Sequence, residues 1–256
     1  MAVSWWSLLI VCPLVFLSGL IDAVAGGGGL ISLPAYLLAG LPPHSAIATN
    51  KLSSCIGTVA STGRFVKNKC VDWPTAIPSA ALAVLGAVAG ANLVLSVGDD
   101  TVRIVMLVFV PVLAFFVIKK RDFADAAPDE ISRKKQFAVV LSMALVVGVY
   151  DGFYGPGTGT FLLLAFTQLA KMPLNTAAGN VKIANLSSNL GSLVVFLLNR
   201  QAIVPLGLIA AVFALAGHFL GAGLLLKKGS KVAKPLILTV LGLLCIRLVL
   251  DLVAGA

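Results

Sequence analysis

The sequence predicts an all-α protein, a polytopic transmembrane helical bundle of two inverted five-helix repeats with short broken helices. The 256 residues are 59% hydrophobic and only 11% charged, and the mean hydropathy is +1.03, so polar surface is too scarce to cover a water-soluble globule. The apolar runs approach the roughly 20 residues of a membrane helix, rather than the roughly 10-residue alternation of barrel strands. A glycine-rich interruption occurs twice, once in each half.

The first half of the chain contains five predicted helices. We expect them at residues 5–25, 30–39, 43–65, 74–97 and 101–118. The turn Pro42-Pro43-His44-Ser45 breaks the chain and caps the third helix. The second helix is about half as long as a membrane is thick, so at least one of its ends stops below the membrane surface.

A charged connection divides the chain into two predicted repeats. Residues 1–118 form the first repeat, 119–135 a cytoplasmic linker and 136–256 the second repeat. The second repeat is expected to contain helices at residues 136–153, 158–170, 175–198, 202–226 and 232–253. The helix at 158–170 is again short.

The two halves align with each other at residues that are not common in so apolar a chain. The matching pairs are Asp22 with Asp151, Pro42 with Pro173, Lys51 with Lys182, Asn68 with Asn199 and Pro74 with Pro205. These residues lie at matching breaks in the hydropathy pattern, which indicates an internal duplication.

An odd number of helices in each half makes the second half enter the membrane from the opposite side. With ten spans, the basic groups 64–69, 119–135 and 227–234 all fall on one face, and both termini lie outside. If the two short helices were re-entrant, the groups 64–69 and 227–234 would fall on opposite faces. Short cytoplasmic connections carry the basic residues, so the charge pattern favours ten spans.

The net charge of +9 is explained by these short connections, so we expect no nucleic-acid partner. The cysteines are far apart and lack neighbouring histidines, which indicates neither a disulfide framework nor a metal site. His44 lies at a helix start and His218 has Ala87 as its repeat partner, and neither has a second ligand one turn away. No catalytic constellation is recognisable, so we expect no enzyme and no cofactor.

The first glycine break, Gly26 to Gly29, is not a phosphate loop, because no Gly-Lys-Ser/Thr follows it. Within a bilayer such a break is tolerated where protein or a watery cavity satisfies the backbone. Close helix packing through small residues is the alternative explanation. Because the break recurs at Gly155 to Thr160, and because a helix that starts after it presents free N–H groups, we favour an anion site.

Lys51 and Lys182 lie about two turns into matching helices, a depth at which an ionisable residue is usually functional. A lysine so near a helix end could instead extend to the lipid headgroups, but the polar residues around both lysines argue against this. The expected substrate-binding residues are Lys51, Lys182, Thr49, Asn50, Gly27, Gly28, Gly29, Ser53, Gly157, Thr158, Asn180 and Asn185. Asp22 and Asp151 precede the breaks and could cap the next helix, pair with a lysine or carry a coupling proton.

Two stretches of the first half carry a family resemblance. The stretch Asp22-Ala-Val-Ala-Gly-Gly-Gly-Gly-Leu-Ile-Ser and the stretch Ala48-Thr49-Asn50-Lys51-Leu52, with their looser second copies, resemble the sulfite exporter TauE/SafE family of bacterial membrane transporters. The resemblance implies transport of a small sulfur-containing anion, such as sulfite or an organosulfonate, across the bacterial inner membrane. Because Gly26 to Gly29 becomes Gly155-Pro156-Gly157-Thr158 in the second copy, the two half-sites are not expected to be chemically equivalent.

The sequence therefore predicts a secondary transporter, an exporter that works by alternating access between its repeats. The expected partners are a small anion and the lipid bilayer, and a homo-oligomer is left open. The alternatives are a proton- or sodium-coupled anion uptake permease and a membrane scaffold that transports nothing.

Overall fold

The structure is a computed structural model that describes residues 5–98, 101, 131–229, 231–232 and 235–236. In the first half it contains α1 (Trp5–Ala25), α2 (Gly29–Leu38), α3 (Pro43–Lys67) and α4 (Trp73–Leu95). In the second half it contains α6 (Arg133–Phe153), α7 (Thr158–Leu164), the π-helix η1 (Ala165–Leu169), α8 (Leu174–Leu198) and α9 (Val204–Lys228). The predicted helices at 101–118 and 232–253 lie almost wholly outside the described residues.

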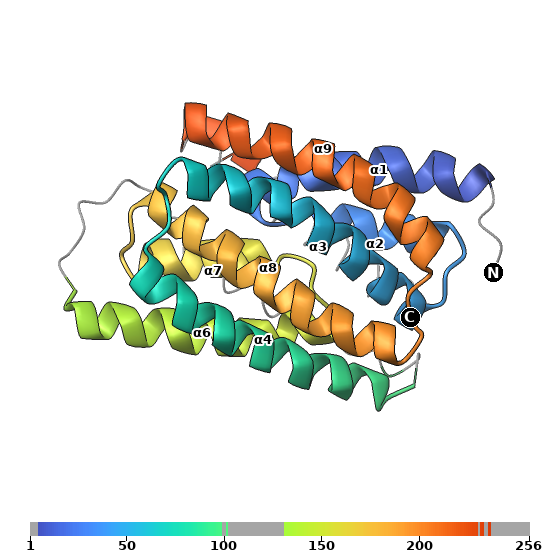
Figure 1. Cartoon of the computed structure of the whole chain (residues 1–256), viewed down its shortest axis with the longest axis horizontal. Coiled ribbons are helices and arrows are strands. Elements are labelled where there is room, and N and C mark those ends of the chain that lie inside the picture. Colours follow the sequence, from blue (N-terminus) through green and yellow to red (C-terminus); the bar gives the residue numbers. More distant parts are fainter. Residues whose placement is uncertain (1–4, 99–100, 102–130, 230, 233–234, 237–256) are drawn as a thin grey trace, which may run out of the picture.

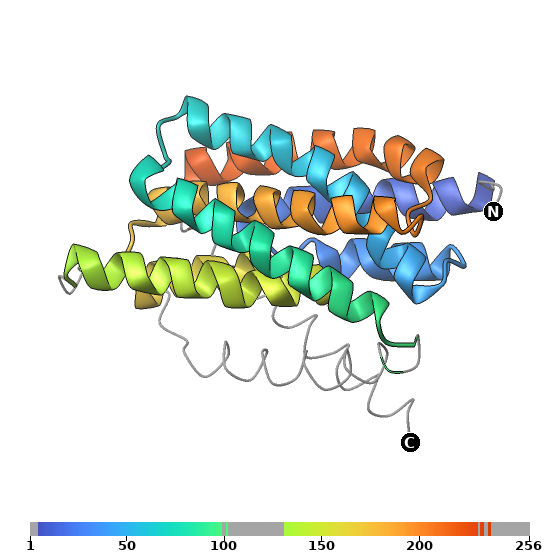
Figure 2. The same cartoon turned by 60° about the horizontal axis from the view of Figure 1, so that its bottom comes forward.

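The described helices run roughly along one long axis, and the connections before and after α3 and α8 lie at its two ends (Figures 1 and 2). The pair α1 and α9 lies on one side of the bundle and the pair α4 and α6 on the other, with α3 and α8 between them (Figure 1). α1 begins at one end of the bundle and α6 at the other (Figure 1). Each of these outer pairs combines one helix from each half of the chain.

The two outer pairs pack closely through glycines. A β-carbon at Gly90 of α4 would overlap the carbonyl oxygen of Val149 on α6. A β-carbon at Gly221 of α9 would likewise overlap the carbonyl oxygen of Leu20 on α1. Small residues let the two backbones approach, as is usual where membrane helices associate.

The central helices α3 and α8 bury polar residues along most of their length. Those of α3 are Thr49, Asn50, Lys51, Ser53, Thr58, Ser61 and Thr62, and those of α8 are Asn180, Lys182, Asn185, Ser188, Asn189 and Ser192. Such residues are costly in lipid, and they are stable here because α1, α4, α6 and α9 surround them. The centre of the bundle along α3 and α8 therefore contains a polar region within an otherwise apolar core.

Five described helices, α1, α4, α6, α8 and α9, are long and apolar enough to cross a membrane. α2 and the continuous segment Thr158–Leu169 are shorter apolar helices. The outer surfaces of α4 and α9 expose large apolar side chains such as Leu85 and Val212. The three tryptophans of the chain are exposed near the helix ends, Trp5 and Trp6 at the start of α1 and Trp73 at the start of α4. Tryptophan favours the membrane–water interface, so this distribution fits a multi-pass membrane protein.

Basic residues gather at one end of the bundle. Asp72, just before α4, pairs with Arg133 at the start of α6 (2.6 Å), and Arg64 near the end of α3 donates to the Phe219 carbonyl of α9 (2.9 Å). The basic residues at this end are Arg64, Lys67, Lys69, Arg133, Lys134, Lys135, Lys171, Lys227 and Lys228. The described part of the opposite end contains one arginine, Arg200, between α8 and α9. The described basic groups thus lie at one end of the bundle, and the ten-span arrangement stays a prediction.

The predicted helix boundaries differ from the observed ones in a few places. α6 begins at Arg133, inside the predicted linker, because the Ser132 hydroxyl accepts a hydrogen bond from the Lys135 amide (3.3 Å) and caps the helix. At α3 the cap residue is Pro42, the first residue of the predicted turn, and no side chain caps the helix. A proline at the first helical position needs no amide partner. The inverted-repeat relation between the halves stays a prediction.

Candidate functional site

The two glycine breaks meet in the middle of the bundle. Gly26 and Gly155, which the sequence alignment pairs, both have left-handed backbone conformations, with φ of 77° and 99°. The Thr160 amide donates to the Gly26 carbonyl (3.2 Å), and the Thr160 hydroxyl donates to the Ala25 carbonyl (2.6 Å). A β-carbon at Gly26 would overlap the backbone of Gly159. The chain therefore brings the two unwound segments into direct backbone contact.

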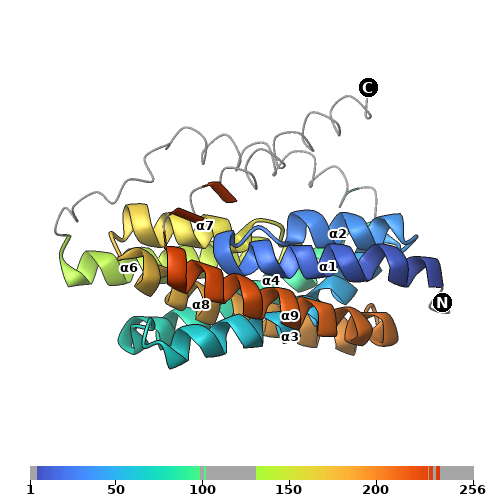
Figure 3. The ribbon, with the colours of Figure 1, turned by 90° about the horizontal axis from the view of Figure 1, so that it is seen from above.

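The short helices α2 and α7 both start at this meeting point and run toward opposite ends of the bundle (Figure 3). Gly29, the first residue of α2, packs against Pro156 just before α7. The Tyr150 hydroxyl fixes that turn by donating to the Pro156 carbonyl (2.6 Å). The starts of two short helices consequently lie close together inside the protein, with the Gly28 amide donating to Asp22 and the Thr160 amide to Gly26.

Lys51 forms a buried ion pair with Asp151 across the two halves. Its Nζ lies 2.8 Å from Asp151 Oδ2, and the two side chains are 2% and 3% exposed. The ammonium also donates to Asn189 Oδ1 (3.1 Å). The carboxylate accepts from the hydroxyls of Thr158 (2.8 Å) and Ser188 (2.7 Å). Neither charge of this pair is left without a polar partner.

Lys182 forms the corresponding pair with Asp22. Its Nζ lies 3.0 Å from Asp22 Oδ2 and also donates to the Asp22 carbonyl. The other carboxylate oxygen accepts from the Gly28 amide at the start of α2 (3.2 Å). Asp22 is 15% exposed, whereas the Lys182 side chain is 3% exposed. The sequence left capping, pairing and proton coupling open for Asp22, and in the structure its carboxylate contacts both Lys182 and the Gly28 amide.

The two ion pairs are crossed between the halves. Lys51 of the first half pairs with Asp151 of the second, and Lys182 of the second half pairs with Asp22 of the first. Each lysine thus holds a carboxylate of the opposite half, beside the glycine breaks. The place where the sequence predicts a bound anion is occupied by the protein's own carboxylates.

His218 of α9 is close to only one of the two pairs. Its Nε2 lies 3.9 Å from Asp22 Oδ2, and its Nδ1 lies 3.2 Å from the Ser61 hydroxyl of α3. The ring is almost fully buried, at 2% exposure. The sequence comparison missed it because Ala87 stands at the matching place in the first half.

Thr49 and Asn180, two of the expected substrate-binding residues, lie away from the ion pairs. The Thr49 hydroxyl accepts from the Ile203 amide (3.0 Å) just before α9, and Asn180 Oδ1 accepts from the Asp72 amide (2.9 Å) just before α4. Each residue thereby holds the start of a helix of the other half. Among the residues that the structure describes, the buried Nδ2 of Asn180 has no hydrogen-bond partner.

Other expected site residues are divided between the centre and its surroundings. Thr158 and Gly28 contact the Asp151 and Asp22 carboxylates directly, whereas the Ser53 hydroxyl accepts from Tyr36 (2.8 Å). The remaining members of the expected set are placed as follows: Asn50 and Asn185 are buried in α3 and α8, Gly27 lies between α1 and α2, Gly29 starts α2 and Gly157 precedes α7 with φ of 84°. Ser188 and Asn189, outside that set, complete the Lys51–Asp151 centre.

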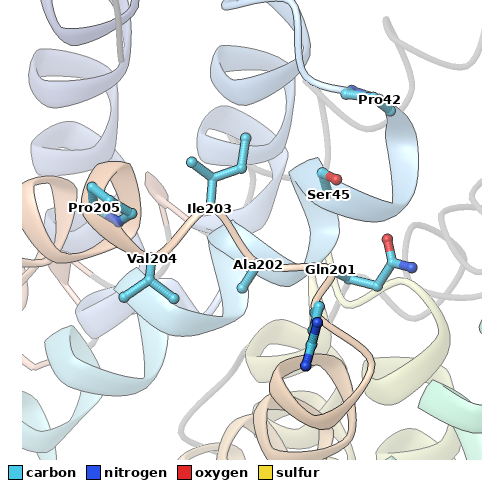
Figure 4. Close-up of a pocket in the computed structure, with 8 residues that line it drawn as sticks. Pro42, Ser45, Gln201, Ala202, Ile203, Val204 and Pro205 are labelled. Carbon is cyan, nitrogen blue, oxygen red and sulfur yellow. The ribbon is translucent and has the colours of Figure 1, made fainter. Parts of the chain in front are cut away.

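A surface hollow lies at the end of the bundle opposite the basic cluster (Figure 4). Its volume is about 490 Å³, and it is lined by Pro42, Ser45 and residues 200–205. Ser45 lies six residues before Lys51, or about 9 Å along the axis of α3. The hollow is therefore separate from the ion pairs and lies at the N-terminal end of α3, the helix that carries Lys51.

Helices that can cross a membrane, together with paired charges buried where two short helices meet, define a class: a multi-pass membrane protein with a charged interior. The family model for the sulfite exporter TauE/SafE matches residues 11–248, so the chain belongs to the TauE/SafE family. No solved structure matches the chain.

Curated relatives carry the names of transporters. The probable membrane transporter protein ORF9 of Sinorhizobium sp is 34% identical over 236 residues, 92% of this chain and 90% of the relative. The probable membrane transporter protein YfcA of Escherichia coli (strain K12) is 33% identical over 253 residues, 96% of this chain and 93% of the relative. Family and relatives together establish the protein as a membrane transporter.

Proposed function

We propose that the protein is a secondary transporter that exports a small sulfur-containing anion, such as sulfite or an organosulfonate, across the bacterial inner membrane. The observation that carries the proposal is the crossed arrangement of Lys51–Asp151 and Lys182–Asp22 where the two glycine breaks meet. Buried ammonium groups beside helix N-termini favour an anionic ligand. The family name supports sulfite as the first anion to test.

In this proposal the substrate takes the place of a carboxylate. The anion contacts the lysine ammonium groups, the Thr158 hydroxyl and the backbone N–H groups of the breaks at Gly27, Gly28, Gly29 and Gly157. Thr49 and Asn180 act indirectly, because they hold α9 and α4 of the opposite half. Each ion pair joins the two halves, so exchanging a carboxylate for a free anion alters what holds them together. Movement of one half against the other then exposes the site alternately to the two sides.

We further propose that the basic end of the bundle faces the cytoplasm and that both termini lie outside. The test introduces single cysteines into a variant of the protein that has no other cysteine. A cysteine at Lys69 or Lys171 should be labelled by a membrane-impermeant reagent only after cells are opened, and one at Arg200 should be labelled in intact cells. Labelling of position 69 in intact cells, or of positions 69 and 171 from opposite sides, would overturn the ten-span arrangement.

Transport itself is tested with purified protein in liposomes of known orientation. Fluxes of sulfite, sulfate, thiosulfate, isethionate and acetate are compared. We expect the protein to move sulfite or isethionate, and we expect Lys51→Ala and Lys182→Ala to reduce that flux to the level of protein-free liposomes. The matched control is Lys134→Ala at the exposed start of α6, which should retain the wild-type flux.

The outcomes separate the candidate functions. Normal flux in both Lys51→Ala and Lys182→Ala would show that the anion site lies elsewhere. Flux of no tested solute by the wild-type protein would favour a membrane scaffold. Net inward movement in cells under physiological gradients would favour an uptake permease over an exporter.

A further inference from the structure

The two crossed ion pairs have unequal surroundings. Asp151 is held by Lys51 and by the hydroxyls of Thr158 and Ser188, at distances between 2.7 and 2.8 Å, and it is 3% exposed. Asp22 has a longer contact with Lys182, 3.0 Å, and it is 15% exposed. Beyond Lys182, its carboxylate accepts one backbone hydrogen bond, from Gly28 (3.2 Å). The Asp22 carboxylate is therefore the easier of the two to displace from its lysine.

Asp22 also has a second proton-binding group beside it. His218 Nε2 is 3.9 Å from Asp22 Oδ2, which is beyond a hydrogen bond but close enough to become one after a small movement. The Ser61 hydroxyl holds the ring through Nδ1 at 3.2 Å. The matching residue in the first half is Ala87, and no second histidine stands beside Asp151 among the described residues.

The charged groups around this histidine come from several helices. Asp22 lies on α1, Lys182 on α8 and the Lys51–Asp151 pair on α3 and α6. Arg64 of α3 contacts the next residue of α9, where its guanidinium stacks 4.3 Å from the centroid of the Phe219 ring and donates to the Phe219 carbonyl. Within the described part of the chain, Asp22 is thus the one carboxylate within ion-pair distance of His218.

The charge balance of the centre then constrains how an anion can bind. With both lysines protonated and both aspartates ionised, the crossed pairs are neutral as a group. An anion that takes Lys182 from Asp22 adds one negative charge to an interior that disfavours unpaired charge. Binding one proton at the same time restores neutrality. The groups beside the anion that can bind this proton are the displaced Asp22 carboxylate and the His218 imidazole.

We propose that Asp22, His218 and Lys182 form a combined proton and anion site, in which an anion replaces the Asp22 carboxylate on Lys182 while a solvent proton binds between Asp22 and His218. The O–H or N–H bond forms on the side where the anion enters and breaks on the side where it leaves. The proposal rests on the proposed transport function and adds its coupling ion. Lys51 keeps its contacts with Asp151 and Asn189, which hold the two halves in register, and its third N–H contacts the same anion.

A consequence is that anion and proton cross together, with no net charge for a monoanion. Flux then follows the combined gradients of anion and proton, and export is driven by anion that accumulates inside. The membrane potential alone moves little anion.

The test measures proton and anion movement together in liposomes that contain the full-length protein. Isethionate is the probe anion, because its charge does not change near neutral pH, and the membrane potential is held at zero with potassium and valinomycin. An enclosed pH-sensitive dye reports protons. For the wild type we expect isethionate entry to acidify the lumen, with one proton for each anion, and an inward proton gradient to drive isethionate accumulation.

Variants of the histidine and aspartate separate coupling from transport. Two variants replace the histidine: His218→Ala introduces the residue found at the matching position 87, and His218→Gln keeps a hydrogen-bonding side chain. Both should lose proton-driven accumulation but still exchange labelled isethionate at equal pH. Asp22→Asn imitates the protonated carboxylate, so any isethionate flux that it retains should be without proton movement. His44→Ala, at the other histidine of the chain, is the matched control and should keep wild-type coupling.

The outcomes are distinguishable from a failure of the transport proposal. Wild-type isethionate flux without proton movement would overturn the combined site while leaving anion transport intact. The combined site would also be overturned if the His218→Ala and His218→Gln variants still moved one proton for each anion. If the protein moves sulfite but not isethionate, proton movement by itself is ambiguous, because sulfite binds a proton near neutrality. In that case the number of protons moved for each sulfite is compared between the wild type and His218→Gln, and equal numbers would overturn the combined site. No flux of either anion would contradict the transport proposal itself. Thermal unfolding in detergent checks that every variant is folded.

Discussion

Lys51→Met should abolish anion flux and lower the free energy of unfolding by about 3–5 kcal/mol, because it leaves a buried carboxylate without its counter-charge. The Lys51 and Asp151 side chains are 2% and 3% exposed, so water cannot replace the lost partner. Thr158 and Ser188 still donate to the carboxylate, but neutral hydroxyls do not balance its charge. The measurement is unfolding by SDS in mixed micelles, with flux measured on the same preparation.

A second substitution distinguishes the stability of the pair from its role in transport. In the double variant Lys51→Met with Asp151→Leu, most of the lost stability should return, because a buried ion pair replaced by apolar residues is often neutral. Ser188 and Thr158 keep acceptors in this variant, since their hydroxyls also lie near the carbonyls of Asn185 (3.1 Å) and Gly155 (2.7 Å). Flux should stay lost, because no ammonium remains at this half of the site.

The control for this series is Lys134→Met, which replaces an exposed lysine at the start of α6. Its free energy of unfolding should change by no more than about 0.5 kcal/mol. A Lys51→Met variant as stable as this control would show that the pair contributes nothing to the fold. Recovery of flux in the double variant would show that Lys51 does not bind the anion.

The sequence predicts the helices well because their ends carry strong local signals. Pro42 and Pro173 stand immediately before α3 and α8, and the glycine breaks separate α1 from α2 and α6 from α7. The π-helix Ala165–Leu169 was not predicted. A π-turn of five residues is too short for its different helical period to appear in the hydropathy pattern.

The sequence also predicts the charged residues of the centre, but it does not predict their pairing. Asp22, Lys51, Asp151 and Lys182 stand out because ionisable residues are rare inside apolar helices. Whether Lys51 meets the aspartate of its own half or of the other depends on how the halves pack. The crossed pairing is a property of the tertiary structure, and the matching sequence positions are compatible with either arrangement.

Thr49 and Asn180 show how a polar stretch of helix can be misinterpreted. Each stands two residues before a lysine, and residues two apart lie about 200° apart around an α-helix. They therefore face a different neighbour from Lys51 and Lys182, and they meet the amides of Ile203 and Asp72. Helical spacing by itself would have divided the polar residues into two faces.

Gly26→Ala should have an effect as large as the loss of Lys51. The residue has φ of 77°, where an alanine costs about 1–2 kcal/mol, and its β-carbon would overlap the backbone of Gly159 and Thr160. The two breaks must then separate, which lengthens the hydrogen bonds from Thr160 to Gly26 and Ala25. We expect a loss of more than about 4 kcal/mol in the free energy of unfolding, together with loss of flux.

Two further glycines separate the causes of this effect. Gly40 has φ of 86° but open space around the position of a β-carbon, so Gly40→Ala measures the backbone conformation alone, at about 1–2 kcal/mol. Gly63 lies in α3 with open space and no left-handed conformation, so Gly63→Ala should stabilise the protein by about 0.5–1 kcal/mol. If Gly26→Ala costs no more than Gly40→Ala, the contact between the two breaks is not tight. In that case the crossed ion pairs, rather than the glycines, hold the halves together at the centre.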